Sequence, residues 1–154
     1  MDIFQVDDAG RLFISPAIDD WDVVASRDID VVIDLDGGLD LCIPTTANRY
    51  LYVYFPFEDD DQQLPDLTKL RAIARLAGSL IGEGHRVLSH CGMGFNRSAL
   101  MAGLILVDLG MTGSQAVARI RERRPGALFN TGFELFLESL AAPGTVFTSS
   151  TSGI

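Results

Sequence analysis

A cysteine and an arginine stand six positions apart in one short segment, His90-Cys91-Gly92-Met93-Gly94-Phe95-Asn96-Arg97-Ser98. An ionised thiol is a strong nucleophile, and a planar guanidinium binds two oxygens of a phosphoryl group at once. Gly92 and Gly94 allow backbone conformations in which successive N–H groups point inward to one anion. We therefore expect a loop that binds a phosphoryl group, keeps Cys91 as a thiolate and lets it attack phosphorus.

The residues on both sides of this loop predict the elements that position it. Val87-Leu88-Ser89 is a short run that follows two glycines, which indicates a buried strand. Residues 99–107 form an apolar run too long for a typical strand, which indicates a buried helix. A strand, a tight loop and a helix together direct backbone N–H groups at an anion. The loop lacks the lysine of the GxxxxGK(S/T) pattern, so a nucleotide triphosphatase of that type is not supported.

His-Cys, five residues and then Arg-Ser resemble the signature of the cysteine-based protein tyrosine phosphatases, and the short chain resembles their compact dual-specificity branch. Residues 11–140 carry the resemblance. Leu12-Phe13-Ile14-Ser15 is similar to the opening of the branch, and Asn130-Thr131-Gly132-Phe133 is similar to the start of its last helix, although Phe129 stands where the family has proline. The resemblance implies a three-layer α/β fold, with a central, mostly parallel sheet of about four or five strands flanked by helices. It also implies a reaction without cofactor or metal.

The resemblance implies a role for each residue of the loop. Cys91 is the nucleophile, and Arg97 binds the phosphoryl group together with the residues between them. Those residues are Gly92, Met93, Gly94, Phe95 and Asn96. His90 orders the loop, and the Ser98 hydroxyl donates to the sulfur when it leaves phosphorus; a helix-capping role is the alternative for Ser98. Asn130 supports the site as the expected cap of the last helix.

An acidic run, Glu58-Asp59-Asp60-Asp61, follows Pro56-Phe57. Release of an alkoxide or phenoxide from phosphorus needs a proton, which a carboxylic acid on a loop can supply. Pro-Phe-Glu-Asp resembles the general-acid loop of the small dual-specificity phosphatases, and this resemblance implies Asp59 as the acid. Asp60 is the second choice and Asp61 the third, because boundary errors are common in such assignments. The simplest alternative is a solvated loop without a catalytic role.

The rest of the chain predicts one catalytic domain over 1–142 and a loosely ordered, Ser/Thr-rich tail over 143–154. Apolar runs bounded by turn residues predict further strands at 3–6, 12–14, 31–33 and 51–55, with a brief strand at 41–43 as an option. Apolar periodicity and helix-start signals predict helices at 19–25, at 65–82 with Pro65 in the first turn, and at 114–123.

Composition limits the functions that the chain can have. A net charge of −9 disfavours nucleic acid and anionic membranes as partners. The two cysteines do not indicate a disulfide scaffold, and the two cysteines and two histidines do not have the spacing of a zinc site. Cys42 is expected to be a small buried residue, with a resolving thiol for Cys91 as the alternative. Without a signal-like or membrane-spanning stretch in the sequence, we expect a cytoplasmic location.

The leading hypothesis is a phosphatase that hydrolyses phosphotyrosine in proteins or peptides, and phosphoserine and phosphothreonine as well if its cleft is shallow. The loop interior has no Lys or His, which disfavours a phosphoinositide preference. Gly94-Phe95-Asn96-Arg97 resembles the loop of the RNA 5′-triphosphatases of the same superfamily, which are the alternative enzyme class. Two further alternatives are a phosphate-binding module without turnover and a sulfur-transfer protein, in which the acidic loop and Ser98 would have no role.

Overall fold

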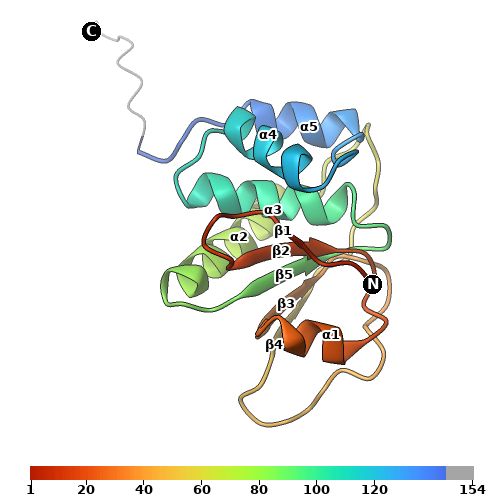
Figure 1. The fold of residues 1–154 in the computed structure, drawn as a ribbon. Coiled ribbons are helices and arrows are strands. Elements are labelled where there is room, and N and C mark those ends of the chain that lie inside the picture. Colours follow the sequence, from red (N-terminus) through yellow and green to blue (C-terminus); the bar gives the residue numbers. More distant parts are fainter. Residues whose placement is uncertain (145–154) are drawn as a thin grey trace, which may run out of the picture.

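The computed structural model describes residues 1–144, in which five strands form one sheet with helices on both faces (Figure 1). The strands are β1 (Phe4–Gln5), β2 (Leu12–Ser15), β3 (Val31–Asp34), β4 (Leu51–Tyr54) and β5 (Val87–His90). The helices are α1 (Trp21–Ser26), α2 (Leu67–Gly82), α3 (Arg97–Asp108), α4 (Gly113–Arg123) and α5 (Thr131–Glu138). The strand order is β1-β2-β5-β3-β4, and only β1 runs antiparallel to its neighbour. The predicted α/β architecture with a mostly parallel sheet is confirmed.

Side chains alternate between two cores along the central strands, because successive residues of a strand face opposite sides of the sheet. In β2, Leu12 and Ile14 join the larger core, whereas Phe13 joins the smaller one. Helix α1 covers the smaller core, and the other four helices lie on the opposite face (Figure 1). The carboxyl ends of β2, β5 and β3 meet at one edge, where Ser15, His90 and Asp34 are in register.

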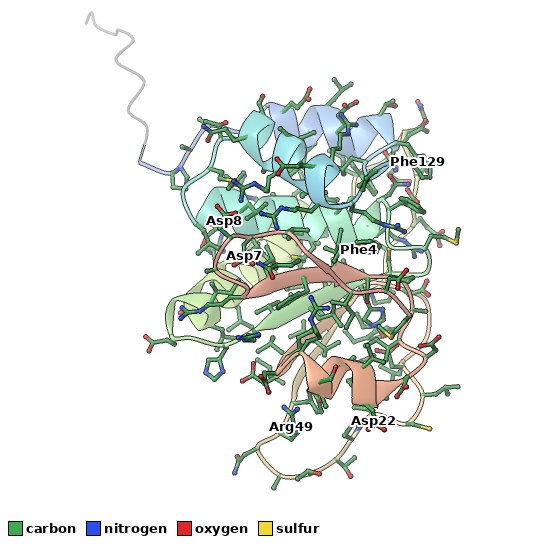
Figure 2. All side chains as sticks on the ribbon, in the orientation of Figure 1. Phe4, Asp7, Asp8, Asp22, Arg49 and Phe129 are labelled. Carbon is green, nitrogen blue, oxygen red and sulfur yellow. The ribbon has the colours of Figure 1, made fainter. Side chains whose placement is uncertain are left out.

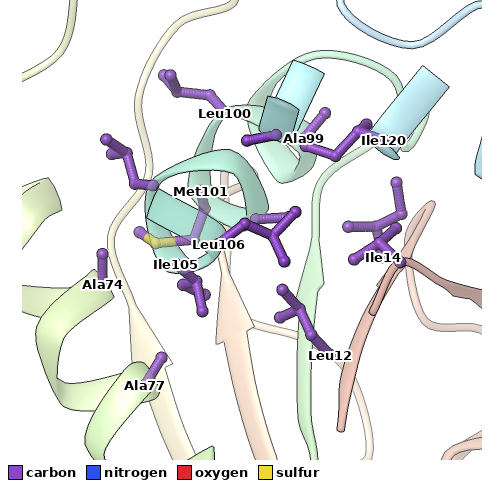
Figure 3. Packing of buried hydrophobic residues seen from close by; sticks show 14 of the residues in the cluster. Leu12, Ile14, Ala74, Ala77, Ala99, Leu100, Met101, Ile105, Leu106 and Ile120 are labelled. Carbon is purple, nitrogen blue, oxygen red and sulfur yellow. The ribbon is translucent and has the colours of Figure 1, made fainter. Parts of the chain in front are cut away.

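Helix α3 runs through the middle of the larger core (Figure 3). Every residue from Ser98 to Val107 is buried, which explains the unbroken apolar run that the sequence has there. A Cβ at Gly103 would lie 2.7 Å from Leu137 Cδ1 of α5, so α3 and α5 pack in close contact. Because α3 is held between the sheet and the other helices, the loop that precedes it leaves the sheet along a fixed direction.

The start of α2 differs from the prediction. The helix begins at Leu67, and the Asp66 carboxylate caps it by accepting the N–H of Lys69 at 3.1 Å. Pro65 precedes this cap and is not in the first turn, so the expectation for Pro65 is wrong. Capping by a short acidic side chain decides the boundary here, rather than the preference of proline for a helix start.

Residues 41–43 form no strand, so this option is wrong. The N–H groups of Gly38 and Asp40 donate to the hydroxyls of Tyr54 and Tyr52 at 2.8 and 3.0 Å. These two N–H groups come before residues 41–43, and within that segment the carbonyl oxygen of Leu41 accepts the Nε1–H of Trp21 at 2.9 Å. Side chains, and not a neighbouring strand, therefore bind the backbone here.

Cys42 is exposed and has a φ of 57°. The expectation of a small buried residue is therefore wrong, because the segment around Cys42 follows the surface instead of entering the core. A role as a resolving thiol stays a prediction.

The predicted single domain over 1–142 lies within the described residues, and of the predicted tail only residues 143 and 144 do. The remainder of that tail, 145–154, lies outside them. Among the described residues, no helix combines the length and the apolar character that crossing a membrane requires.

We predict that Gly113→Ala destabilises the fold. A Cβ at Gly113 would lie 1.5 Å from the carbonyl oxygen of Leu137, so α4 and α5 would have to separate. We expect the free energy of unfolding to fall by about 1–3 kcal/mol or more, measured by urea denaturation. Gly82→Ala is the matched control, because no atom lies within 4 Å of a Cβ at Gly82. Equal stability of the two variants would contradict the packing described here.

Candidate active site

The predicted phosphate loop joins the end of β5 to the start of α3 at the edge of the sheet. Gly94 has a φ of 75°, and a Cβ there would lie 2.7 Å from the backbone nitrogen of Pro16. Both its conformation and its packing therefore require glycine at this position. The φ of Gly92 is not positive, so the expected left-handed conformation holds for Gly94 and not for Gly92.

The carbonyl groups of the loop point away from its centre, because each accepts a hydrogen bond from outside. The donors are Ala17 N to Gly92 O (3.2 Å), Arg124 Nη2 to Met93 O (3.3 Å), Arg124 Nε to Gly94 O (3.3 Å) and Leu128 N to Phe95 O (2.8 Å). In a trans peptide the next N–H points opposite to the carbonyl, and residues 1–144 contain no cis peptide. The N–H groups of residues 93–96 therefore face the inside of the loop, which forms an anion-binding nest.

Cys91 lies at the base of this nest. Its Sγ accepts the N–H of Gly94 at 3.3 Å and lies 3.4 Å from the Ser98 hydroxyl. The Cys91 residue is only 2% exposed, but these polar neighbours show that it is not enclosed by apolar groups alone. Ser98 does not cap α3, because the cap position belongs to Asn96. The capping alternative for Ser98 is therefore wrong, and its hydroxyl is directed at the sulfur.

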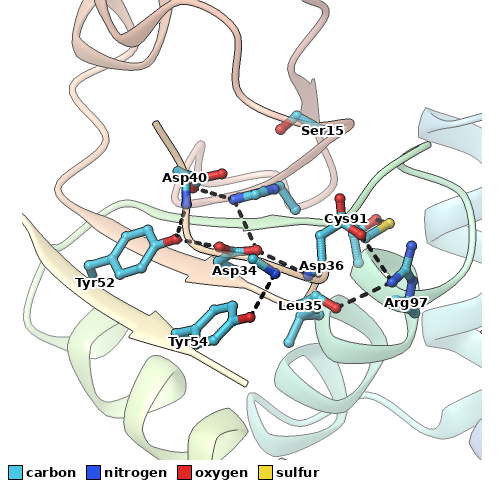
Figure 4. Close-up of polar contacts among 12 residues, drawn as sticks. Ser15, Asp34, Leu35, Asp36, Asp40, Tyr52, Tyr54, Cys91 and Arg97 are labelled. Carbon is cyan, nitrogen blue, oxygen red and sulfur yellow. Dashed lines mark hydrogen bonds and ion pairs between the residues drawn. The ribbon is translucent and has the colours of Figure 1, made fainter. Parts of the chain in front are cut away.

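Arg97 is directed toward the loop and not toward solvent. Its Nη1 donates to Asp36 Oδ1 at 3.2 Å and contacts the backbone oxygen of Leu35 at 3.5 Å (Figure 4). The same atom lies 3.3 Å from the backbone oxygen of Phe57. A Cβ at Gly92 would lie 3.4 Å from Arg97 Nη2. The Nε–H is buried and has no hydrogen-bond partner among the described residues. Because buried N–H groups are rarely unpaired, this donor is suited to an oxyanion in the loop.

His90 is held by two carboxylates behind the loop. Its Nε2 lies 2.7 Å from Asp40 Oδ2 and 3.6 Å from Asp34 Oδ1 (Figure 4). The His90 Nδ1 is buried without a partner among residues 1–144. These contacts fix the orientation of the ring directly before Cys91, and the ordering role of His90 stays a prediction.

Tyr52 completes this buried network. Its hydroxyl donates to Asp34 and accepts the N–H of Asp40 at 3.0 Å. Burial raises the pKa of Asp34, and burial together with the hydrogen bond to Asp34 raises the pKa of Tyr52. Asp34, Asp40 and His90 each offer one ligand atom within 4.8 Å of the others, and each of these side chains also takes part in a hydrogen bond of the network.

Of the three candidate acids, Asp59 is the one that contacts the phosphate loop. Its Oδ2 accepts from Asn96 Nδ2 at 2.9 Å, and its Oδ1 accepts from Asn130 Nδ2 at 2.7 Å. The Asp60 and Asp61 side chains bond instead to the neighbouring Gln62. Asn130 also caps α5 by accepting the N–H of Phe133 at 3.0 Å, so the predicted cap is confirmed.

Several residues of the site were not identified in the sequence. Asp36, Asp40 and Tyr52 belong to the segments around β3 and β4, and their contacts depend on strand pairing. Arg124 lies at the end of α4, and no pattern in the sequence distinguishes it from the neighbouring Arg119, Arg121 and Arg123. Its guanidinium lies 3.9 Å from the Phe95 ring centroid, outside the nest, so it supports the loop from behind. Two carboxylates close to the end of the predicted strand at 31–33, Asp34 and Asp36, are the signal that could have indicated the acidic members.

Comparison with known proteins supports the same fold. No family model matches the sequence, and no curated protein matches it. Similar solved structures include a mutant form of Tk-PTP, which is 27% identical with a TM-score of 0.70, where the match covers 88% of this chain and 93% of that one. Human DUSP28 is 20% identical with a TM-score of 0.72, covering 88% and 90% of the two chains. PTPMT1 in complex with PI(5)P is 17% identical with a TM-score of 0.74, covering 89% and 93%. The chain therefore has the fold of the compact dual-specificity phosphatases, as its loop sequence implied.

Proposed function

We propose that the protein is a cysteine-dependent phosphatase that hydrolyses phosphotyrosine monoesters in proteins or peptides, and phosphoserine and phosphothreonine to the extent that they reach Cys91. The observation that carries this proposal is the nest of inward N–H groups over Cys91. Beside it lies the Nε–H of Arg97, which has no hydrogen-bond partner within residues 1–144. Such a cradle matches the three non-bridging oxygens of a phosphoryl group. The fold shared with dual-specificity phosphatases supports the same reaction.

In the first step, the Cys91 thiolate attacks phosphorus and the bond to the leaving oxygen breaks. Asp59 gives its proton to that oxygen, so the alcohol or phenol departs neutral. Arg97 and the N–H groups of residues 93–96 bind the equatorial oxygens, over which charge is spread in the transition state. The products of this step are the alcohol and a phosphocysteine.

In the second step, water attacks the phosphocysteine while Asp59, now a carboxylate, takes a proton from it. The S–P bond breaks and the electron pair returns to sulfur, which gives inorganic phosphate and the thiolate. The Ser98 hydroxyl, 3.4 Å from Sγ, donates to the sulfur as it gains charge. Each group therefore ends in the state in which it began.

The charge around the site favours a phosphoprotein over polyanionic substrates. A hollow of about 380 Å³ is lined by the acidic run at 58–61 together with Phe129 and Asn130. Phe129, which stands where the family has proline, is 68% exposed at the surface near the start of α5 (Figure 2). Carboxylates at this position repel the additional phosphates of a 5′-triphosphate RNA or a phosphoinositide, whereas an aromatic ring can contact a phosphotyrosine ring.

A catalytic thiolate needs a reducing compartment, which supports a cytoplasmic location as part of the proposal. Residues 1–142 would form the catalytic domain, and no metal or cofactor takes part in the proposed reaction. Phosphorylated proteins or peptides are the expected partners, with nucleic acid and membranes disfavoured by the charge of −9.

Replacing the nucleophile tests the scheme directly. We expect Cys91→Ser to lower the turnover of an aryl phosphate by about 10³-fold or more, because a serine hydroxyl is not ionised there. Binding of a phosphotyrosine peptide, measured by calorimetry, should survive because the nest is retained. Cys42→Ser is the control and should keep wild-type turnover under reducing conditions. Wild-type turnover by Cys91→Ser would exclude the mechanism.

The identity of the acid is tested by pH–rate profiles. Asp59→Asn should lower kcat for phosphotyrosine by about 10²–10⁴-fold and remove the fall in activity at high pH, since that fall reports loss of the acid's proton. Asp60→Asn should keep most of the turnover and the shape of the profile. The reverse result would assign the acid to Asp60.

A substrate panel separates the proposed function from its alternatives. We expect kcat/KM for a phosphotyrosine peptide to exceed that for triphosphate-ended RNA and for a soluble phosphoinositide by about tenfold or more at low salt, because the acidic rim repels polyanions. Higher salt should reduce this difference in kcat/KM, because salt screens the repulsion between the acidic rim and the polyanions. A preference for the RNA would favour the triphosphatase alternative, and binding of the peptide without turnover would favour the binding module.

A further inference from the structure

We propose that Asn96 and Asn130 are positioning residues that hold the Asp59 carboxyl group in place for proton transfer. The proposal rests on the function proposed above. It assigns to the Asn96 side chain a role in addition to the phosphoryl binding by its backbone N–H, and it assigns to Asn130 a role beyond capping α5.

The two amides bind opposite oxygens of one carboxyl group. Asn96 Nδ2 lies 2.9 Å from Asp59 Oδ2, and Asn130 Nδ2 lies 2.7 Å from Asp59 Oδ1. Asn96 is 2% exposed and Asn130 is 5% exposed, although Asp59 itself lies on the surface. Buried donors therefore hold an acid that belongs to an exposed loop.

Neither amide can rotate to exchange its nitrogen and oxygen. Asn96 Oδ1 accepts the backbone N–H of Asn130 at 2.9 Å, and Asn130 Oδ1 accepts the backbone N–H of Phe133 at 3.0 Å. A rotated amide would bring an NH₂ group against a backbone N–H and leave both donors unpaired. The backbone therefore fixes both side-chain nitrogens in the direction of Asp59.

The backbone of the acidic loop is seated at the same place. A Cβ at Gly132 would lie 2.3 Å from the carbonyl oxygen of Asp61, so glycine allows this loop to pack against the first turn of α5. The acid is thereby tied to the phosphate loop through Asn96 and to α5 through Asn130. Since Asn96 directly precedes Arg97, the group that donates the proton and the group that binds the phosphoryl oxygens share one rigid support.

Two variants each remove one of the side-chain NH₂ groups that donate to Asp59, and they differ in how they affect the rest of the fold. Asn96→Ala removes the side-chain amide of Asn96 and keeps its backbone N–H in the loop. Asn130→Ser removes the second donor but keeps a residue that caps helices well, so α5 should remain folded. Circular dichroism and the urea midpoint of each variant report whether the fold is retained.

The readout is the dependence of kcat on the leaving group. For phenyl phosphate, whose leaving group needs the proton, each variant should lower kcat by about 10- to 100-fold. For p-nitrophenyl phosphate, whose leaving group departs readily as an anion, the loss in kcat should be about tenfold smaller than the loss on phenyl phosphate. In an Asp59→Asn background, the same substitutions should cause no further selective loss, because the group that they position is already absent.

The possible results are distinguishable. Equal losses on both esters, or the same loss with and without Asp59, would assign a structural role to the asparagines and overturn this inference alone. Unchanged kcat on phenyl phosphate would overturn it as well. Failure of the wild-type protein to hydrolyse either ester would overturn the proposed function, and this inference with it.

Discussion

The site depends on hydrogen bonds that hold four carbonyl groups of the loop, those of residues 92–95, away from its centre. Ala17, Arg124 and Leu128 donate to the loop from three different parts of the chain, and trans-peptide geometry then turns the following N–H groups inward. The donors lie before α1, at the end of α4 and before α5, so the nest can form only when these parts of the fold are assembled. We expect that an isolated peptide of these nine residues would not adopt this conformation, since its carbonyl groups would bind water instead of these donors.

A positive site in a chain of charge −9 has to be built from local dipoles and from one guanidinium. Asp36 contacts Arg97 at 3.2 Å and fixes its orientation, but it also neutralises part of the positive charge at the proposed phosphate site. Since backbone N–H groups carry no net charge, they add positive potential at the sulfur without a counter-ion of their own. The N–H groups of the nest, more than Arg97 alone, must therefore supply the positive potential that attracts an anion to a loop surrounded by carboxylates.

The sequence predicted the parts of the fold that depend on local pattern. The loop between β5 and α3, the buried helix and the Asn130 cap follow from spacing, apolar period and capping preference. The contacts of Asp36, Asp40 and Arg124 join segments that lie far apart in the chain, so no local pattern could indicate them. Cys42 was misplaced for a related reason. The short apolar run at 41–43 pairs with no strand and lies on the surface, where the distant Trp21 side chain donates to the carbonyl oxygen of Leu41.

Asn96 shows that a sequence motif does not by itself determine what a side chain contacts in the folded site. The motif places it among residues that bind phosphate, and Gly94-Phe95-Asn96-Arg97 resembles the loop of the RNA 5′-triphosphatases. In the folded chain its amide instead binds Asp59, with its orientation fixed by the N–H of Asn130. The same residue type is therefore compatible with an enzyme that uses a carboxylic acid. What separates the two interpretations is the direction of one amide group, which depends on a helix cap 34 residues further along the chain.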